Sequence, residues 1–356
     1  MHTLRKLTSF AVMLMCLYIL SHSPSYRQWQ QYSGEKLESG RMKNVTASTA
    51  QGQPLFPPAA GADSPLPLPE VRPVLVAAMS QKESSALKTK ALVSPEEAKL
   101  RDESIRETTI EGGLSIKNRT SYPVDMGKLL MEPVPVKLSG EGMQVLVIHT
   151  HASEAYTPAG LDLYEASDDC RTEDTKYNIV RVGDELCTVL EQAGLRVLHD
   201  RNIYDYPSYT GSYNRSGDAV QGWLAEYPEI SVVIDMHRDA LGENGTVYKT
   251  MAEEEGVCAS QIMLLAGTDE SGLSHPLWQQ NLSLALYLQR TVSAAHPTLM
   301  RPVELVPQRY NQHLCTGSLI LEVGSSGNTL QEALAAIRLF GKAAAPALLS
   351  LVSQEG

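Results

Sequence analysis

The sequence predicts a three-layer α/β domain, in which a mostly parallel β-sheet lies between helices. Several runs are apolar at nearly every position, which is typical of strands buried on both faces of a sheet. These runs alternate along the chain with segments whose apolar residues recur at helical spacing. Both kinds of segment lie within residues 113–353, so we expect one globular domain there.

The predicted elements follow one another closely through this domain. Strands are expected at residues 143–150, 195–200, 230–237, 245–252, 259–267 and 317–324. Helices are expected at residues 178–194, 213–228 and 276–297, with a last helix starting at about Thr329. Thr329 and Glu332 form a T-x-x-E capping box at the start of this last helix, and Gly194 is placed to end the first one.

The N-terminal segment, residues 1–23, is predicted to be a membrane anchor. Basic residues precede an uncharged apolar run at residues 7–20, which favours an orientation with the rest of the chain outside the cytoplasm. The run is shorter than the ~20 residues of a typical spanning helix, so a cleaved signal peptide is the alternative. Because Pro24 follows the small residues that could form a cleavage site, we favour an uncleaved, single-pass anchor in the cell membrane.

Residues 24–112 are predicted to be a spacer. The segment is rich in Pro and Ala, as in QGQPLFPPAAGADSPLPLPEVRP, and shows neither helical nor strand periodicity. Such a composition cannot bury enough apolar surface to offset the entropy of ordering, so we expect a disordered, semi-extended tether. An anchor followed by a tether would let the globular domain work at some distance from the membrane.

The composition excludes several classes of function. The net charge of −11 and the pI of 5.3 argue against a nucleic-acid-binding protein, which usually has a basic face. The five cysteines form no C-x-x-C pair and are odd in number, which argues against a zinc ribbon or a disulfide framework. There is no G-x-S-x-G, H-E-x-x-H or P-loop motif. Any metal would therefore be bound by His and carboxylate side chains.

Three predicted strands end in residues that could carry chemistry. His149 follows one apolar run, His237 follows a second, and Glu322 follows a third. In open α/β sheets, ligands bind beyond the carboxyl ends of the strands, so these side chains are expected to meet at one edge. Two histidines and a carboxylate suit Zn²⁺, which in catalytic sites takes three protein ligands and lowers the pKa of a bound water.

The third ligand has two candidates. Asp174 stands just before a predicted helix, from where it would point into the crevice, and Glu154 lies in the loop after His149. Either choice leaves Glu322 free to act as a general base, taking a proton from water and delivering it to the leaving amine.

Each of these residues also has a simpler interpretation. Asp174 alone is most simply a helix N-cap, and one histidine after a strand is usually a loop or core residue. Thr150 and His151 are expected to fill the loop. The residues around His237 could form a structural ion-pair cluster or orient a ligand; they are Asp235, Arg238 and Asp239. No single residue predicts a metal site. The site is favoured because three strands end in such residues at the same edge of the sheet.

Six segments in one order resemble the stage II sporulation protein P family over about residues 113–350. They are VLVIHTHASEAYTP, NIVRVGDEL, YTGSYNRS, DMHRDA, AGTDESGLSHPLWQQNLSLAL and RYNQHLCTGSLILEVGSSGNTLQEAL. The resemblance implies a zinc-dependent cell-wall hydrolase related to N-acetylmuramoyl-L-alanine amidases, with endopeptidase action on cross-links as well. It also implies a peptidoglycan substrate, and stage II sporulation proteins D and M as partners during engulfment of the forespore.

The resemblance also implies roles for individual residues. His149, the first His of the H-T-H motif, and His237, in the D-x-H-R-D-A motif, would be zinc ligands, and Glu322 would match the catalytic glutamate. The related amidases place a glutamate where Asp174 stands, so Asp174 is the favoured acidic ligand and Glu154 the alternative. Two other functions stay open: a different zinc peptidase such as a carboxypeptidase, and a non-catalytic wall-binding protein with the same fold.

Overall fold

The structure is a computed structural model that describes residues 105–109, 114–243, 245–254 and 256–353, all within the compact unit Leu75–Gly356. The predicted anchor, residues 1–23, and all but five residues of the predicted spacer, residues 24–112, lie outside these described residues. Within the described part of the chain, no helix is both long enough and apolar enough to cross a bilayer.

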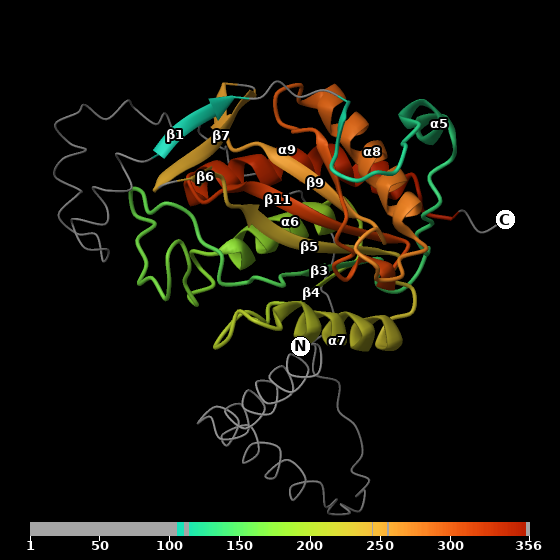
Figure 1. Ribbon diagram of the computed structural model, residues 1–356, viewed down its shortest axis with the longest axis horizontal. Helices are drawn as coiled ribbons and strands as arrows, with labels where there is room; N and C mark the ends of the chain where they lie inside the picture. The colour runs from blue at the N-terminus through green and yellow to red at the C-terminus, as the bar shows by residue number, and fades with distance from the viewer. Residues whose placement is uncertain (1–104, 110–113, 244, 255, 354–356) are drawn as a thin grey trace, which may run out of the picture. The chain divides into compact units, whose positions relative to one another are not determined.

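A seven-stranded sheet forms the centre of the domain, as Figure 1 shows. Five of its six strand pairings are parallel, and only β9 and β11 run antiparallel. This confirms the predicted α/β class with a mostly parallel sheet. In spatial order the strands are β2 (Ile116–Asn118), β10 (Val303–Val306), β9 (Ile262–Gly267), β11 (Gly317–Ser325), β5 (Val232–Asp239), β3 (Val145–Ile148) and β4 (Val197–His199).

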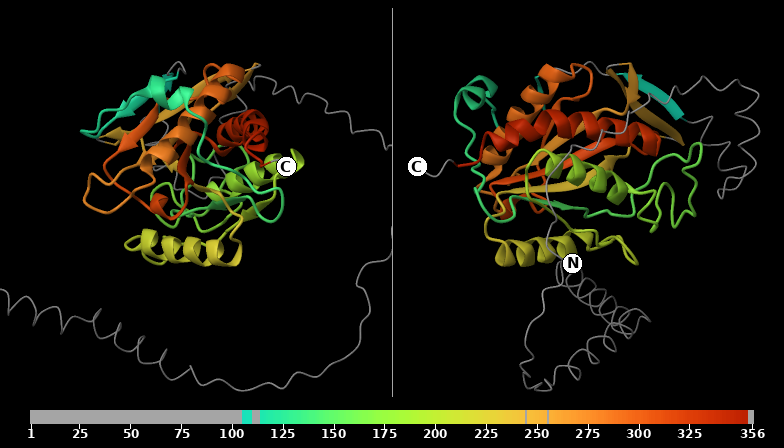
Figure 2. Two further views of the ribbon diagram at one scale, coloured as in Figure 1. Left: turned by 90° about the vertical axis from the view of Figure 1, so that its right-hand side faces the viewer. Right: turned by 180° about the vertical axis from the view of Figure 1, so that it is seen from behind.

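Helices cover both faces of this sheet, which gives the predicted three layers (Figures 1 and 2). Three helices pack on one face in a single large apolar cluster; they are α6 (Ile179–Gln192), α8 (Trp278–Ala295) and α9 (Leu330–Leu349). On the other face α7 (Ser212–Glu226) packs through Val220 and Trp223. The capping box of Thr329 and Glu332 is present at the start of α9, as predicted.

A smaller sheet contains a strand from the segment that was predicted to be spacer. β1 (Ile105–Thr109) pairs in parallel with β7 (Thr246–Glu254), which also pairs with β6 (Gly242–Glu243) and β8 (Val257–Ala259). The short helix α5 (Met126–Met131) and the 3₁₀ turn η2 (Gln312–Leu314) complete the described elements. β1, β2, β10 and α5 have no counterpart among the elements predicted from the sequence.

Side chains of β3 alternate between the two faces of the large sheet. Val145 and Val147 pack in the cluster that contains α6, α8 and α9. Leu146 and Ile148 pack in the smaller cluster under α7. Because successive residues of a strand point to opposite faces, the residue that follows Ile148 points toward α6.

The same alternation places the functional groups of β5 and β11 on the α7 side. In β5, Val233 packs in the cluster under α7, so Asp235 and His237 share its face. In β11, Leu321 packs with the helices of the opposite face, so its neighbour Glu322 faces the α7 side. Glu322 and His237 are direct partners in the register of the two strands.

Gly183 is predicted to be essential for the packing of α6 on the sheet. A Cβ atom at this position would lie 2.6 Å from His149 Nε2 and 2.8 Å from His199 Nε2, closer than real Cβ contacts allow. We expect Gly183→Ala to lower the free energy of unfolding by about 1–3 kcal/mol through overpacking. Urea unfolding followed by circular dichroism measures this.

Gly222 provides the matched control for this substitution. It lies in α7, and an added Cβ there meets nothing within 4 Å. Gly222→Ala is therefore expected to raise the free energy of unfolding by about 0.5–1 kcal/mol, because alanine restricts the unfolded chain and favours the helix. Equal stability of the Gly183 variant and the wild type would contradict the close packing of α6.

Candidate metal centre

Three buried side chains converge near the carboxyl ends of β3 and β5: His151 and Glu154, from the turn after β3, and His237, from β5 itself. Their potential ligand atoms all lie within 4.8 Å of one another. The Nδ1 atom of each histidine lies 3.4 Å from a different oxygen of Glu154. The two imidazole rings are perpendicular, with their centres 5.0 Å apart. Within the described residues this is the only such group of potential metal ligands, and we refer to it as the metal-binding group.

A tight turn after β3 brings two of these residues into the group. The strand ends at Ile148, and the N–H of Glu154 donates to the carbonyl of His151 at 3.0 Å. The carbonyl of Glu154 accepts from the N–H of Ile179, the first residue of α6, at 2.7 Å. Glu154 is thus held at the start of the helix, and its side chain turns back toward His151 and His237.

The outer nitrogen of each histidine has a polar neighbour. His151 Nε2 lies 3.2 Å from Ser212 Oγ, and His237 Nε2 lies 3.1 Å from Asp235 Oδ1. Asp235 is itself fixed, because it accepts hydrogen bonds from the backbone N–H of Thr150 at 2.8 Å and from its hydroxyl at 2.6 Å. These contacts fix the orientation of the rings so that both Nδ1 atoms face Glu154.

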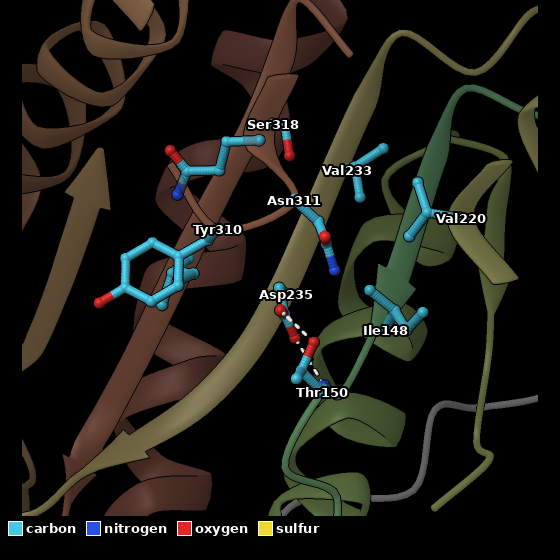
Figure 3. Close-up of a pocket in the computed structure, with 10 residues that line it drawn as sticks. Ile148, Thr150, Val220, Val233, Asp235, Tyr310, Asn311 and Ser318 are labelled. Atoms are coloured by element: carbon cyan, nitrogen blue, oxygen red, sulfur yellow. Dashed lines mark hydrogen bonds between the residues drawn. The ribbon is translucent and has the colours of Figure 1, made fainter. Parts of the chain in front are cut away.

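Asp235 lies between the metal-binding group and a small cavity under α7. Figure 3 shows Asp235 and Thr150 joined by two hydrogen bonds at the edge of this cavity. The other residues that line it come from β3, β5, β11, α7 and the segment around η2; they include Ile148, Val220, Val233, Tyr310, Asn311 and Ser318. These contacts favour a role of Asp235 in orienting a metal-ligating histidine over a role in a structural ion-pair cluster.

The charges around Glu154 favour its ionised form. Burial opposes ionisation, but the Arg238 guanidinium and the hydrogen bonds with His151 and His237 hold the pKa of Glu154 well below its ordinary value. The backbone N–H of Arg238 also donates to Glu154 Oε2 at 3.1 Å. The side chain of Arg238 is occupied by carbonyls, donating to Ala155 and Cys170. Glu154 is therefore a carboxylate that can serve as an anionic ligand.

Glu322 stands beside this group. Its Oε2 atom is buried and has no hydrogen bond to any of the described residues. Burial raises the pKa of Glu322 to about 8, and the nearby carboxylates of Asp239 and Glu154 act in the same direction. A carboxyl group with such a pKa can take up and release a proton near neutral pH, which is what a general acid–base catalyst needs.

His149 lies on the opposite face of the sheet, away from this group. Its Nε2 atom is 2.8 Å from Nε2 of His199, and its Nδ1 atom is 3.3 Å from the carbonyl of Met236. Burial under α6, with the neighbouring His199, lowers the pKa of His149 to about 3. The structure therefore places His149 in the core beneath Gly183, and it places His151 in the position that was predicted for His149.

Asp174 also lies outside the group. It is exposed, and its carboxylate accepts a hydrogen bond from the N–H of Lys176 at 3.0 Å. The helix begins at Ile179, within one residue of the predicted start, and its N-cap is Asn178, four residues after Asp174. The structure thus brings together His237, Glu322 and the alternative ligand Glu154, and it adds His151, which the sequence pattern favoured only as a loop residue.

Tyrosines surround the two histidines. The ring of Tyr209 stacks on His151 with centres 4.5 Å apart, and the ring of Tyr213 stacks on His237 at 6.4 Å. Tyr213 also contacts Tyr310, with ring centres 5.2 Å apart. Burial raises the pKa of Tyr213 and of Tyr310, so both phenols stay neutral. Tyr209 and Tyr213 thus each contact one histidine of the metal-binding group.

Comparison with known proteins identifies the family. The family model for stage II sporulation protein P (SpoIIP) matches residues 66–345. The chain belongs to the stage II sporulation protein P family. This confirms the resemblance predicted from the six sequence segments.

The stage II sporulation protein P of Bacillus subtilis (strain 168) is 25% identical over 209 residues, which are 56% of this chain and 49% of that protein. The chain thus spans about half the length of this curated relative.

Solved structures of amidases are also similar to this SpoIIP family member. The N-acetylmuramoyl-L-alanine amidase AmiC2 of Nostoc punctiforme has 13% sequence identity and a TM-score of 0.33, and the match covers 59% of this chain and 98% of that chain. The CwlD amidase from Clostridioides difficile, solved in complex with the GerS lipoprotein, has 14% identity and a TM-score of 0.34, and the match covers 58% of this chain and 98% of that chain.

Proposed function

We propose that this member of the SpoIIP family is a zinc-dependent peptidoglycan hydrolase. Its reaction would be hydrolysis of the amide between muramic acid and the stem peptide, and it would also act as an endopeptidase on the cross-links. The observation that carries the proposal is the group formed by His151, Glu154 and His237, which lies beside Glu322, whose Oε2 atom has no hydrogen bond within the described part of the chain.

The residues of this group fit a zinc ion. Two imidazole nitrogens and one carboxylate oxygen are the donor set of many catalytic zinc sites, and three protein ligands leave one position open. Both Nδ1 atoms face the carboxylate of Glu154, and a polar side chain holds the other nitrogen of each ring. Bound there, zinc would supply a Lewis acid and would lower the pKa of the attacking water.

The chain's own residues would carry the proton transfers. Glu322 would accept a proton from the attacking water, because its carboxyl faces the same side of the sheet as His237 and has a pKa near neutral. It would then deliver this proton to the leaving amide nitrogen, which cannot depart as an anion. Arg238 would keep Glu154 ionised, so that only Glu322 exchanges protons during turnover.

The family suggests where this reaction takes place. We propose that residues 1–23 anchor the chain in the cell membrane and that the part of the predicted spacer ahead of β1, residues 24–104, tethers a catalytic domain outside the cytoplasm. The substrate would then be the cell wall that is remodelled during engulfment in sporulation. Stage II sporulation proteins D and M are the proposed partners. Fluorescence microscopy of a fusion protein in sporulating cells, with and without residues 1–23, tests the location.

Product analysis tests the activity. The purified full-length protein would be incubated with a soluble disaccharide–peptide, and the products would be separated by mass spectrometry. Amidase action releases the intact stem peptide and the sugar. Release of single amino acids would favour a carboxypeptidase instead. Binding without any cleavage, at full zinc occupancy, would favour the non-catalytic wall-binding protein and would contradict the proposal.

Asp235 is predicted to strengthen zinc binding without touching the metal. Asp235→Asn removes the negative charge beside His237 Nε2 and keeps the size of the side chain. We expect zinc affinity to fall by about 10–100-fold, as is usual when a carboxylate that orients a metal-binding histidine is lost. Competition with a fluorescent zinc chelator measures the change. Ser231→Ala, directly ahead of the same strand and with a hydroxyl that contacts only the carbonyl of Glu229 within the described residues, provides a control with unchanged affinity.

A further inference from the structure

An exposed tyrosine lies directly over the candidate metal centre. Tyr209 is 56% exposed, although its ring stacks on the imidazole of His151 at 4.5 Å with an angle of 27°. The guanidinium carbon of Arg171 lies 5.0 Å from the centre of the same ring. His151 and Arg171 both contact the Oε1 atom of Glu154, at 3.4 and 3.5 Å, so these two neighbours of the ring belong to the same cluster. More than half of the surface of Tyr209 stays exposed, so the ring still offers an open face to a ligand.

The loop that carries Tyr209 is held rigidly in this position. Arg215 of α7 donates hydrogen bonds to the carbonyls of Tyr204 at 2.7 Å and of Thr210 at 3.1 Å. Asp205 accepts from Ser153, in the turn that carries the metal-binding residues, and from Arg171 at 2.7 Å. Because the loop is tied to both α7 and this turn, an open aromatic face is presented at a fixed place before any ligand arrives.

We propose that the open face of Tyr209 is the binding platform for the amino-sugar ring that carries the scissile amide. The inference rests on the proposed function, in which the bond that is cleaved joins a lactyl group on a pyranose to the stem peptide. The group next to the reacting carbonyl on one side is then a sugar. A pyranose has a flat face of C–H bonds, and such a face packs well against an aromatic ring.

The surroundings of Tyr209 favour a sugar over the acidic stem peptide as the occupant. Arg171, the cation behind the ring, is already engaged by Asp205 and Glu154. Its charge is therefore used within the protein, and the open face offers an apolar ring with a phenol group at its edge. This combination suits the C–H face and the hydroxyl groups of a sugar, and it does not suit a carboxylate.

Two measurements on the full-length protein test the platform. The first is steady-state kinetics on a disaccharide–peptide, and the second is binding of a peptide-free glycan fragment to the zinc-loaded Glu322→Gln protein. Tyr209→Ala is expected to raise KM about fivefold, with kcat nearly unchanged, since a lost aromatic contact costs about 1 kcal/mol. Glycan binding should weaken by a similar factor. Tyr209→Trp should preserve both KM and glycan binding.

Tyr206 provides the matched control for this loop. It is 50% exposed and lies three residues away, and no ring contact of Tyr206 is present among the described residues. Tyr206→Ala is expected to leave KM and zinc content unchanged. Equal effects of the Tyr206 and Tyr209 variants would overturn the proposal, because they would show a role of the whole loop.

Other results would also overturn the platform. One is loss of zinc or a fall in kcat at constant KM in Tyr209→Ala, which would show that the ring only covers the metal centre. Another is unchanged glycan binding by this variant together with weaker binding of the free stem peptide. Failure of the proposed function looks different: the wild type would not cleave the amide, yet Tyr209 would still control glycan binding.

Discussion

His151→Ala is expected to abolish zinc binding and peptidoglycan hydrolysis together. His151 is one of only three side chains in the described metal-binding group, so its loss leaves two ligands and opens the site to water. We expect zinc affinity to fall more than about 100-fold, beyond the usual effect of a residue that only orients a ligand. Mass spectrometric determination of zinc after dialysis, combined with dye release from labelled cell walls, measures both losses.

His149 provides the control, two residues earlier in the same motif. Its imidazole lies on the α6 face against His199, so His149→Asn is expected to keep its zinc. This variant should instead lose stability, because His199 Nε2 loses its buried partner. A His149 variant that is folded but free of zinc, next to a His151 variant that retains it, would contradict the assignment of the ligands.

The difference between these two histidines shows what the sequence could and could not predict. The three strand ends correctly marked the edge of the sheet, and Glu322 and His237 face each other there. The side of the sheet on which each residue emerges depends on the alternation along its strand. For the two histidines of the H-T-H motif, the side of the sheet also depends on the turn after Ile148. This turn changes the direction of the chain and places His151 next to Glu154 and His237. Turn geometry of this kind was not visible in the pattern of apolar residues.

The acidic ligand illustrates a second limit. Asp174 was favoured because it precedes the first helix, but the helix begins at Ile179 and Asp174 is exposed. Glu154 reaches the start of this helix through a backbone hydrogen bond from Ile179, a contact across 25 residues of chain. Periodic sequence patterns indicate contacts only between residues that are close in the chain, one helical turn or one strand position apart. They therefore could not predict the hydrogen bond between Ile179 and Glu154.

Elements of the fold were predictable where their local signals were strong. The long amphipathic helices and the capping box at Thr329 appear as predicted. β2 and β10, with three and four residues, are too short to show a period of their own and exist because they extend the sheet beyond β9. The antiparallel pairing of β9 with β11 was likewise invisible, since a buried strand has the same composition in either direction.

Glu322→Gln is expected to abolish hydrolysis while zinc binding is retained. Glutamine has nearly the shape of the carboxyl group but cannot take a proton from water, and Glu322 is not a member of the metal-binding group. We expect kcat to fall by about 10²–10⁴-fold, the usual contribution of a general acid–base catalyst. Steady-state kinetics on a disaccharide–peptide, with zinc content measured in parallel, give the two values.

The stability of the metal-free protein gives an independent test of the same residue. Burial raises the pKa of Glu322 to about 8, above its ordinary value of 4.5, so the folded state binds the proton more tightly than the unfolded state does. The contribution of this group to stability is then complete below pH 4.5 and is lost as the pH rises through about 8. Glutamine does not titrate, so Glu322→Gln should become more stable relative to the wild type as the pH rises over this range. A difference in melting temperature that stays constant from pH 5 to pH 8 would show that the pKa of Glu322 is not raised in the folded protein, which would contradict the buried environment assigned to this carboxyl.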